Sequence, residues 1–187
     1  MQYPRSWYPL CRSNDLKSGR VKPVKALGLK LAVFRTVKGE LGAVKSQCCH
    51  IGADLSLGWV DGERLVCPLH HWAFDTQGEC RNIPCQKEIP ARLRQQSFLC
   101  CERFGVVYAY LGEKSDGSSI PFGVLDSGIC SSPLIIDFDA PYEMAGANSF
   151  DEQHLATVHR REVIGGQKIS SDSERHFAIE YRARVIP

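Results

Sequence analysis

Four residues near the middle of the chain combine thiols and imidazoles in two closely spaced pairs. Cys48 and His50 form a C-x-H pair, and after a spacer of 16 residues Cys67 and His70 form a C-x-x-H pair. Each pair offers one thiolate and one imidazole, the side chains that bind zinc and iron in proteins. The spacing therefore predicts a metal site that is assembled from two short loops.

The mixed order of these ligands favours one kind of metal site. A Rieske [2Fe–2S] centre places two Cys on one iron and two His on the other, so it suits two loops that each supply one of both. Zinc also accepts two Cys and two His, but zinc sites more often pair like residues as C-x-x-C and H-x-x-x-H. We therefore expect Cys48, His50, Cys67 and His70 to bind an iron–sulfur cluster, with tetrahedral zinc as the alternative.

The residues around these pairs suit tight loops. Gly52 and Gly58 permit sharp turns, and Pro68 stiffens the second loop. His71 follows the second pair directly and is expected to be exposed or to lie behind the ligands. Trp72 is expected to pack beneath the loops and to limit the access of water.

The composition of the 187 residues is that of an ordinary globular protein, with 43% hydrophobic and 24% charged residues. Twenty-three Lys and Arg against 21 Asp and Glu give a net charge of +2, so we expect no nucleic-acid partner. No apolar run approaches the roughly 20 residues that span a bilayer, and the N-terminus lacks a signal-peptide pattern. We expect a cytoplasmic protein without a membrane partner, in which nine cysteines favour metal ligation over disulfides.

Short strands separated by turns predict a first domain over residues 1–111. Hairpins are expected at residues 28–44, 72–78 and 98–111. A polar Gly/Ser-rich stretch predicts a linker at residues 112–121, followed by a second domain over residues 122–187. There we expect extended segments at residues 133–138 and 176–185, and a helix that begins at Ser149, where S-x-x-E has the form of a capping box.

A second group of possible ligands lies at this predicted helix. Asp151 and His154 are three residues apart and would share one helical face. His159 is five residues further on and converges with His154 only if the helix ends or distorts before it. Two histidines and one carboxylate form the facial triad of non-haem Fe(II) sites, although histidines on a helix are more often surface or core residues. The iron–sulfur motif upstream favours iron binding by His154 and His159.

The two groups in this order resemble the Rieske non-haem iron oxygenases, specifically their oxygenase (alpha) subunit. The segments CPLHHWAFDTQGEC, ERFGVVYAYLG and NSFDEQHLATVH are most similar to arylamine oxygenases of the aminopyrrolnitrin oxygenase type. The resemblance implies a mainly β fold, in which a Rieske [2Fe–2S] β-sandwich domain precedes the truncated start of an α+β helix-grip-like catalytic domain.

The resemblance also implies an activity and its partners. A ferredoxin or an NAD(P)H-dependent reductase would supply electrons to the cluster, which would pass them to mononuclear Fe(II) for O₂-dependent oxidation of a small organic substrate, aromatic or an arylamine. Asp151 would link a cluster histidine to an iron histidine across the subunit interface of a homotrimer.

This sequence departs from the family at the iron site. The third iron ligand of the family is a carboxylate far downstream, so the chain is expected to hold an incomplete iron site. Carboxylates in the tail are available as substitutes, although each is more simply a solvated charge: Glu162, Asp172, Glu174 and Glu180. The alternative function is a Rieske ferredoxin-like electron carrier that uses residues 1–111 alone, or an inactive oxygenase fragment.

Overall fold

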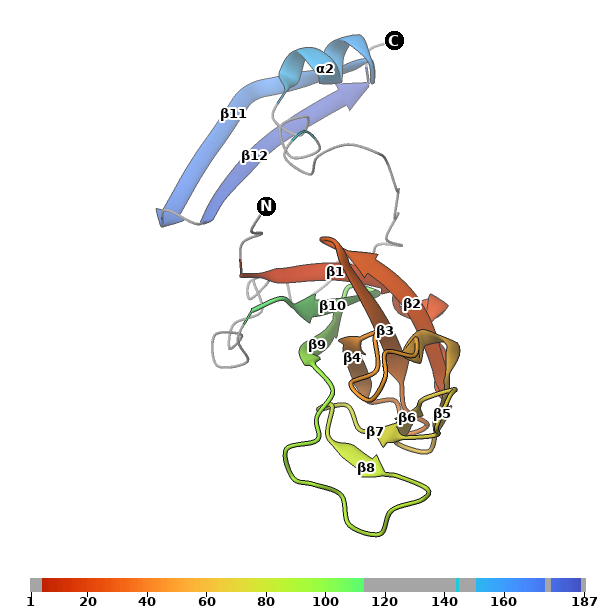
Figure 1. The fold of residues 1–187 in the computed structure, drawn as a ribbon. Coiled ribbons are helices and arrows are strands. Elements are labelled where there is room, and N and C mark those ends of the chain that lie inside the picture. The colour runs from red at the N-terminus through yellow and green to blue at the C-terminus, as the bar shows by residue number, and fades with distance from the viewer. Residues whose placement is uncertain (1–4, 113–143, 145–150, 174–175, 186–187) are drawn as a thin grey trace. The chain divides into compact units, whose positions relative to one another are not determined.

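The fold is described for two separate units of the chain (Figure 1). The computed structural model describes residues 5–112, 144, 151–173 and 176–185. Contacts between Cα atoms divide the chain into Met1–Ile135 and Ile136–Pro187. Most of the predicted linker and the predicted segment 133–138 lie outside the described residues, so the domain boundaries stay predictions.

A six-stranded antiparallel sheet is the framework of the first unit. Its strands, in spatial order, are β1 (Trp7–Arg12), β10 (Val106–Tyr110), β9 (Ser97–Arg103), β4 (Leu41–Lys45), β3 (Leu29–Arg35) and β2 (Arg20–Ala26). A short 3₁₀ turn, η1 (Ser13–Asp15), follows β1. The first and last strands of the unit, β1 and β10, therefore pair at one edge of the sheet, and β9 joins them to β4.

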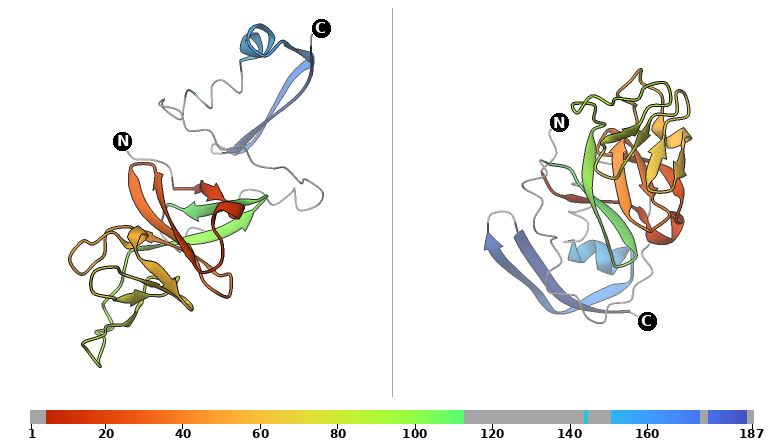
Figure 2. Two further views of the ribbon diagram at one scale, coloured as in Figure 1. Left: turned by 90° about the vertical axis from the view of Figure 1, so that its right-hand side faces the viewer. Right: turned by 90° about the horizontal axis from the view of Figure 1, so that it is seen from below.

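A four-stranded antiparallel sheet is inserted in the chain between β4 and β9. Its strands, in spatial order, are β5 (Trp59–Asp61), β6 (Arg64–Val66), β7 (Ala73–Phe74) and β8 (Cys80–Asn82). The 3₁₀ turn η2 (Leu55–Leu57) precedes β5. Figure 2 shows this sheet, gold to olive, at one end of the first unit together with the long connection from β8 to β9.

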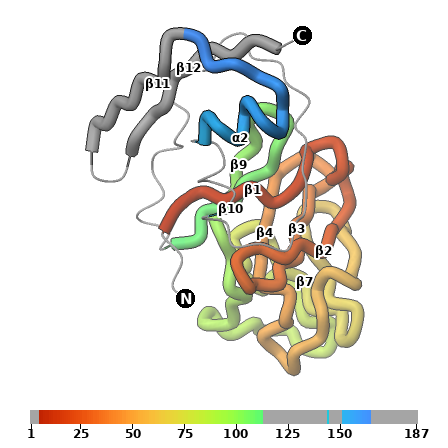
Figure 3. The backbone as a smooth tube through the Cα atoms, turned by 90° about the horizontal axis from the view of Figure 1, so that it is seen from above, coloured from red at the N-terminus to blue at the C-terminus, as the bar shows by residue number. Residues whose placement is uncertain are grey.

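The three predicted hairpins are confirmed. β3 pairs with β4, β7 with β8, and β9 with β10. In the β3–β4 hairpin Phe34 faces Gly42 across the ladder, and a Cβ atom at Gly42 would lie 2.5 Å from the Phe34 ring. Glycine is therefore required there by close packing. β1 pairs with β10, which is far from it in the sequence, and Figure 3 shows the two strands side by side.

Both faces of β3 are buried, because alternate residues of a strand point to opposite sides. Leu31 and Val33 belong to one hydrophobic cluster, and Ala32 and Phe34 belong to another. The second of these clusters also contains Phe74 of β7, so it joins the large sheet to the small one. Phe34 and Phe74 are both fully buried, and truncation of either to Ala would cost about 3–5 kcal/mol. The packing that joins the sheets also fixes the loops between them.

The described part of the second unit is a short helix followed by a long antiparallel hairpin. These elements are α2 (Glu152–Thr157), β11 (Arg161–Ser173) and β12 (His176–Val185). The predicted extended segment at residues 176–185 is confirmed. With strands dominating both units, the molecule is mainly β.

The start of α2 differs from the prediction. Ser149, the predicted cap, lies outside the described residues, and the helix begins at Glu152 instead. Its N-cap is Asp151, whose Oδ1 accepts a hydrogen bond from the His154 backbone N–H at 3.0 Å. Asp caps a helix as well as Ser does, and the Asp151 carboxylate reaches the third N–H of this first turn. The capping-box prediction was therefore wrong.

Candidate metal centre

Two loops carry the four predicted cluster ligands. Loop 1, residues 48–53, lies between β4 and η2, and loop 2, residues 67–72, connects β6 to β7. A backbone pair closes each loop. Gln47 and Asp54 form an isolated bridge below loop 1, whereas Val66 and Ala73 below loop 2 belong to the β6–β7 ladder.

Loop 1 is shaped by two backbone hydrogen bonds. The Cys48 N–H donates to the Ala53 carbonyl at 2.8 Å, and the Gly52 N–H donates back to the Cys48 carbonyl at 2.9 Å. Gly52 has a φ of 85°, in the left-handed region that L residues enter at a cost. The turn leaves the Cys48 side chain buried and the His50 side chain exposed.

Loop 2 repeats this pattern with different residues. The Cys67 N–H donates to the Trp72 carbonyl at 2.8 Å, and the His71 N–H donates back to the Cys67 carbonyl at 3.1 Å. His71 occupies the position of Gly52 in loop 1 and also has a positive φ, 58°. Cys67 is buried and His70 is exposed. Both loops therefore present a buried thiol and an exposed imidazole from equivalent backbone turns.

The four side chains come together in two layers. Cys67 lies close enough to Cys48 to raise the pKa of its thiol, and Cys48 and Cys67 are 3% and 2% exposed. The ring centroids of His50 and His70 lie 4.8 Å apart, with the planes at 65°. A buried thiol pair beneath an exposed imidazole pair is the order in which two irons, one with two sulfur and one with two nitrogen ligands, would be bound.

Burial controls the chemistry of the inner pair. The pKa of the Cys48 thiol is raised to about 12, mainly because the thiol is removed from solvent. The nearby Cys67 adds to this rise, and the backbone N–H of His50 partly offsets it. The Cys48 thiol therefore keeps its proton until a cation displaces it, so metal binding at this pair must release protons.

A tryptophan connects the two loops. Trp72 of loop 2 stacks on His50 of loop 1, with ring centroids 4.1 Å apart and planes at 9°. The sequence predicted that Trp72 packs beneath the loops, and the structure adds that the indole lies against a predicted ligand. The exposed His71 makes a separate edge contact with Trp59, at 5.0 Å.

The second predicted ligand group is partly assembled. α2 ends at Thr157, and the rings of His154 and His159 meet with centroids 4.7 Å apart, so the predicted end of the helix before His159 is confirmed. Asp151 stands at the N-cap and uses Oδ1 there. Glu162 is exposed, Glu174 lies outside the described residues, and for Asp172 and Glu180 the structure describes the backbone alone.

Neither the four predicted cluster ligands nor the predicted ligands at α2 surround a single point. Among the residues that the structure describes, no three His, Cys, Asp or Glu side chains gather closely enough to hold one metal ion. A tetrahedral zinc site requires four donors around one ion. Two pairs in separate layers, as loops 1 and 2 present them, favour a centre with two metal ions.

A known family of protein domains matches the part of the chain that carries loops 1 and 2. Residues 6–98 match the family of Rieske [2Fe-2S] domains. This segment is a Rieske domain. The match includes both loops and the strands that hold them, so the two-layer arrangement of thiols and imidazoles lies inside the Rieske domain.

Relatives extend the likeness beyond the Rieske domain. Methylxanthine N1-demethylase NdmA of Pseudomonas putida is 32% identical over 165 residues, which cover 82% of this chain and 46% of that protein. Cholesterol 7-desaturase of Hemicentrotus pulcherrimus is 40% identical over 176 residues, or 84% of this chain and 36% of that protein. The chain is homologous to Rieske non-haem iron oxygenases and spans about half or less of these two relatives.

Solved structures agree with this assignment. The NdmA structure superposes with a TM-score of 0.70 at 31% identity, over 83% of this chain and 50% of that one. Dicamba monooxygenase with non-heme iron and dicamba gives a TM-score of 0.66 at 25% identity, over 92% and 57%. In the part of the chain that the structure describes, no helix has the length and apolar character to cross a membrane.

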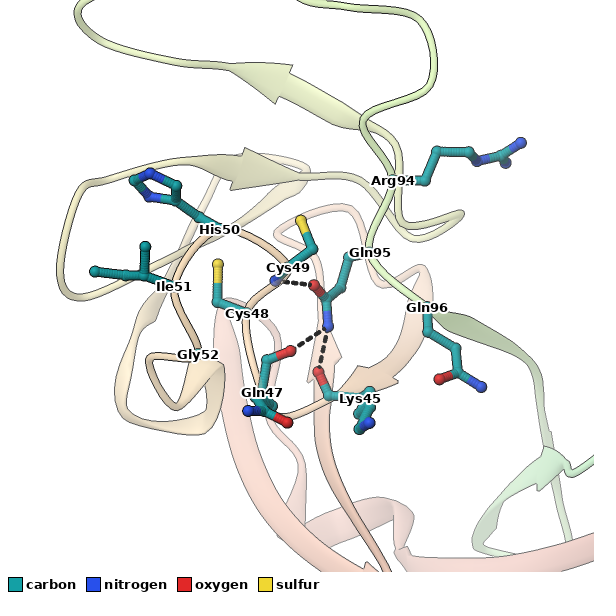
Figure 4. Close-up of a pocket in the computed structure, with 10 residues that line it drawn as sticks. All are labelled: Lys45, Gln47, Cys48, Cys49, His50, Ile51, Gly52, Arg94, Gln95 and Gln96. Carbon is teal, nitrogen blue, oxygen red and sulfur yellow. Dashed lines mark hydrogen bonds between the residues drawn. The ribbon is translucent and has the colours of Figure 1, made fainter.

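Sequence reasoning missed one polar residue of the Rieske domain. Beside loop 1 is a hollow of about 480 Å³, and the buried polar side chain in its wall is Gln95 (Figure 4). An isolated Gln far from either ligand pair gives no motif. The signal that finds it is burial of an amide next to a loop.

Proposed function

We propose that Cys48, His50, Cys67 and His70 bind a [2Fe–2S] cluster, with the two thiolates on the inner iron and the two imidazoles on the outer iron. The observation that carries this proposal is the buried thiol pair beneath an exposed imidazole pair 4.8 Å apart. Zinc is the less suitable occupant, because the donors stand in two layers.

We further propose that the whole protein is an oxygenase component. His154 and His159 would bind mononuclear Fe(II), and a carboxylate from outside the described residues would complete the facial triad. When bound, the cluster supplies one-electron storage and the Fe(II) supplies O₂ activation. A ferredoxin or an NAD(P)H-dependent reductase is the proposed electron donor, in the cytoplasm.

The chain's own residues would serve this activity in distinct ways. The exposed side chains of His50 and His70 would offer the surface at which electrons enter and leave, and the burial of Cys48 and Cys67 would keep water from the iron that they hold. Asp151 uses Oδ1 to cap α2, so Oδ2 is the atom that would contact a cluster histidine of a neighbouring subunit in the proposed homotrimer. The closeness of the His154 and His159 rings, 4.7 Å, supports their joint role.

A small organic substrate is part of the proposal. The homologous proteins act on methylxanthines and cholesterol by their names, and dicamba occupies one solved structure. An aromatic ring or an arylamine is the substrate class that the sequence resemblance favours. The aminopyrrolnitrin-type specificity rests on that resemblance alone.

An electron carrier is the second candidate, because the first unit by itself contains all four predicted ligands and both hydrophobic clusters. Iron and acid-labile sulfide per chain, after anaerobic reconstitution, separate the candidates. We expect two sulfides, the EPR signal of a reduced Rieske centre and, in the whole oxygenase that includes the third ligand, a third iron that is lost in His154→Ala. Two irons with no effect of His154→Ala would favour the carrier, and one zinc without sulfide would contradict both.

A further inference from the structure

The clearest unassigned feature of the Rieske domain is a buried amide beside loop 1. Gln95 is 3% exposed, whereas its neighbours Arg94 and Gln96 are exposed. Figure 4 shows the Gln95 amide between loop 1 and the end of β4, while Arg94 and Gln96 point away from them. A buried amide destabilises a fold unless all its polar atoms find partners.

Every hydrogen-bonding group of this amide is used on the chain around loop 1. The Gln95 Oε1 accepts from the Cys49 N–H at 2.8 Å. Its Nε2 donates to the Lys45 carbonyl at 2.7 Å and to the Gln47 carbonyl at 2.8 Å. A side-chain amide has two donor hydrogens, so both are used. One side chain thus spans the backbone from the end of β4 into loop 1.

The backbone of Gln95 is fixed as well. Its N–H donates to the Gly78 carbonyl at 2.7 Å, in the turn between β7 and β8. A Cβ atom at Gly78 would lie 2.2 Å from the Gln95 carbonyl oxygen, and Gly78 has a φ of 78°. The approach of these two backbones is therefore too close for any other residue at position 78. It anchors the amide against the small sheet.

Loop 1 needs such a support more than loop 2 does. Loop 2 is closed by Val66 and Ala73, which belong to a four-stranded sheet. Loop 1 is closed by the isolated bridge of Gln47 and Asp54. Gln95 bonds the carbonyl of Gln47 itself, so it supports a closing bridge that, unlike that of loop 2, belongs to no strand ladder.

We propose that Gln95 is a positioning residue for the cluster, which holds loop 1 so that Cys48 and His50 stay opposite Cys67 and His70. The inference rests on the proposed cluster ligation. Gln95 also occupies the Cys49 N–H, which directly follows the proposed ligand Cys48. Because hydrogen bonds to cluster sulfurs help to set the electronic properties and potential of such clusters, release of an N–H beside a ligand would change the spectrum of the centre.

Two variants and a control test this role. Gln95→Met keeps the size of the side chain and removes all three hydrogen bonds. Gln95→Asn keeps the amide but shortens its reach by one methylene. Gln96→Met makes the same change at the exposed neighbour that lines the same hollow. The readouts are the rate of cluster loss to a chelator, well below the melting temperature, and the EPR g values of the reduced centre.

We expect Gln95→Met to lose the cluster at least tenfold faster than the wild type and to show shifted g values, with Gln95→Asn in between and Gln96→Met within twofold. A purely structural role would lower thermal stability and leave the g values unchanged. Wild-type g values together with a loss rate within twofold in Gln95→Met overturn the proposal, as does equal loss in Gln96→Met. If Gln95→Met does not fold, the rate of cluster loss and the g values of Gln95→Asn are judged by the same criteria.

Hydrogen exchange of the Cys49 amide separates this inference from the proposed function, because it is measured on the chain without metal. We expect exchange at Cys49 to be at least tenfold faster in Gln95→Met, with amides of loop 2 unchanged. Fast exchange in a wild type that binds no cluster would contradict both proposals. Slow exchange without a cluster would contradict the ligand assignment and leave the support of loop 1 by Gln95 established.

Discussion

Loop 1 and loop 2 form the same backbone turn from sequences that share little besides a Cys and a His. In each, the Cys N–H and carbonyl make the same two bonds, five and four residues ahead. The supports differ, because a sheet extends the closing pair of loop 2, whereas an amide side chain fastens that of loop 1. The position of a thiol and an imidazole is thus determined by the turn, and the turn can be stabilised in more than one way.

The loops also differ at their left-handed residue. Gly52 enters this region without a steric penalty, whereas His71 bears a penalty of about 1–2 kcal/mol. Loop 2 tolerates that cost because paired strands continue from both its ends. The loop with the weaker closing pair is the one with glycine.

The largest expected effect concerns the equivalence of the two thiols. Cys48→Ser and Cys67→Ser should each abolish the cluster, because the inner iron loses one of only two thiolates. Visible absorbance, sulfide content and EPR measure the loss. Cys49→Ser is the matched control, an exposed neighbour that should retain the centre. If either serine variant keeps a normal centre, the two loops are not equivalent in binding it.

The contact between the loops gives the next largest effect. Trp72→Ala removes the indole that stacks on His50 and should lower the free energy of unfolding by about 2 kcal/mol, roughly half the cost for a fully buried Trp. Urea unfolding followed by circular dichroism measures this loss. Trp59→Ala is the control, since Trp59 is 44% exposed and its ring contacts His71, which is not a proposed ligand. If both variants lose the same free energy of unfolding, the stack of Trp72 on His50 does not stabilise the contact between the loops.

The left-handed position offers a smaller, two-sided test. Gly52→Ala should lower the free energy of unfolding by about 1–2 kcal/mol, because Ala at a φ of 85° is strained. His71→Gly should be about 1 kcal/mol more stable than His71→Ala. Both His71 variants lose the imidazole, so their difference reports the backbone alone. Equal stability of these two variants in urea would show that loop 2 bears no strain.

The smallest effect concerns the exit of loop 1. Burial tends to raise the pKa of Asp54, but hydrogen bonds from Ser56 and the charge of Lys30 outweigh it and hold the pKa below its usual value. The lowered pKa stabilises the fold above the ordinary Asp value of about 3.9, and this is lost as the pH falls through the folded pKa. Asp54→Asn should therefore be less stable than wild type by at most about 1 kcal/mol at pH 7.

The pH profile is the check on this last expectation. The difference in the free energy of unfolding between wild type and Asp54→Asn, measured without metal, should shrink as the pH falls from about 5 to about 3. This range brackets the ordinary Asp pKa of about 3.9. A difference that stays constant with pH would contradict the assigned pKa direction. Asp54 is the N-cap of η2, and this cap survives in the variant, because an Asn side chain also accepts the hydrogen bond from the Ser56 N–H.

Local patterns in the sequence predicted what local forces determine. The hairpins follow from alternating apolar residues between turn signals. A continuous helix cannot bring together two residues that are five positions apart, so the sequence predicts that the helix ends before His159 if its ring is to meet that of His154. The cap of α2 was misjudged because Ser149 and Asp151 are both good N-caps, and sequence alone does not rank two caps two residues apart.

The rest depends on contacts between distant residues. Gln95 reaches Lys45 across 50 positions of the chain, and the stack of Trp72 on His50 depends on how two loops are oriented. Neither contact leaves a periodic or spaced pattern in the sequence. The positive φ of His71 was hidden for a related reason, since only its equivalence to Gly52 in the folded loop reveals it.

The insertion between β4 and β9 has a consequence for how such a domain can vary. The two strands pair at Val44 and Ser97, and one further bond, from the Lys45 N–H to the Gln96 carbonyl at 2.9 Å, brings together the points at which the intervening chain leaves and rejoins the sheet. All four proposed cluster ligands lie between those two points. The length of the exposed parts of this segment can therefore change while the register of β4 and β9 is kept, provided that the residues packed against β3, such as Phe74, are retained.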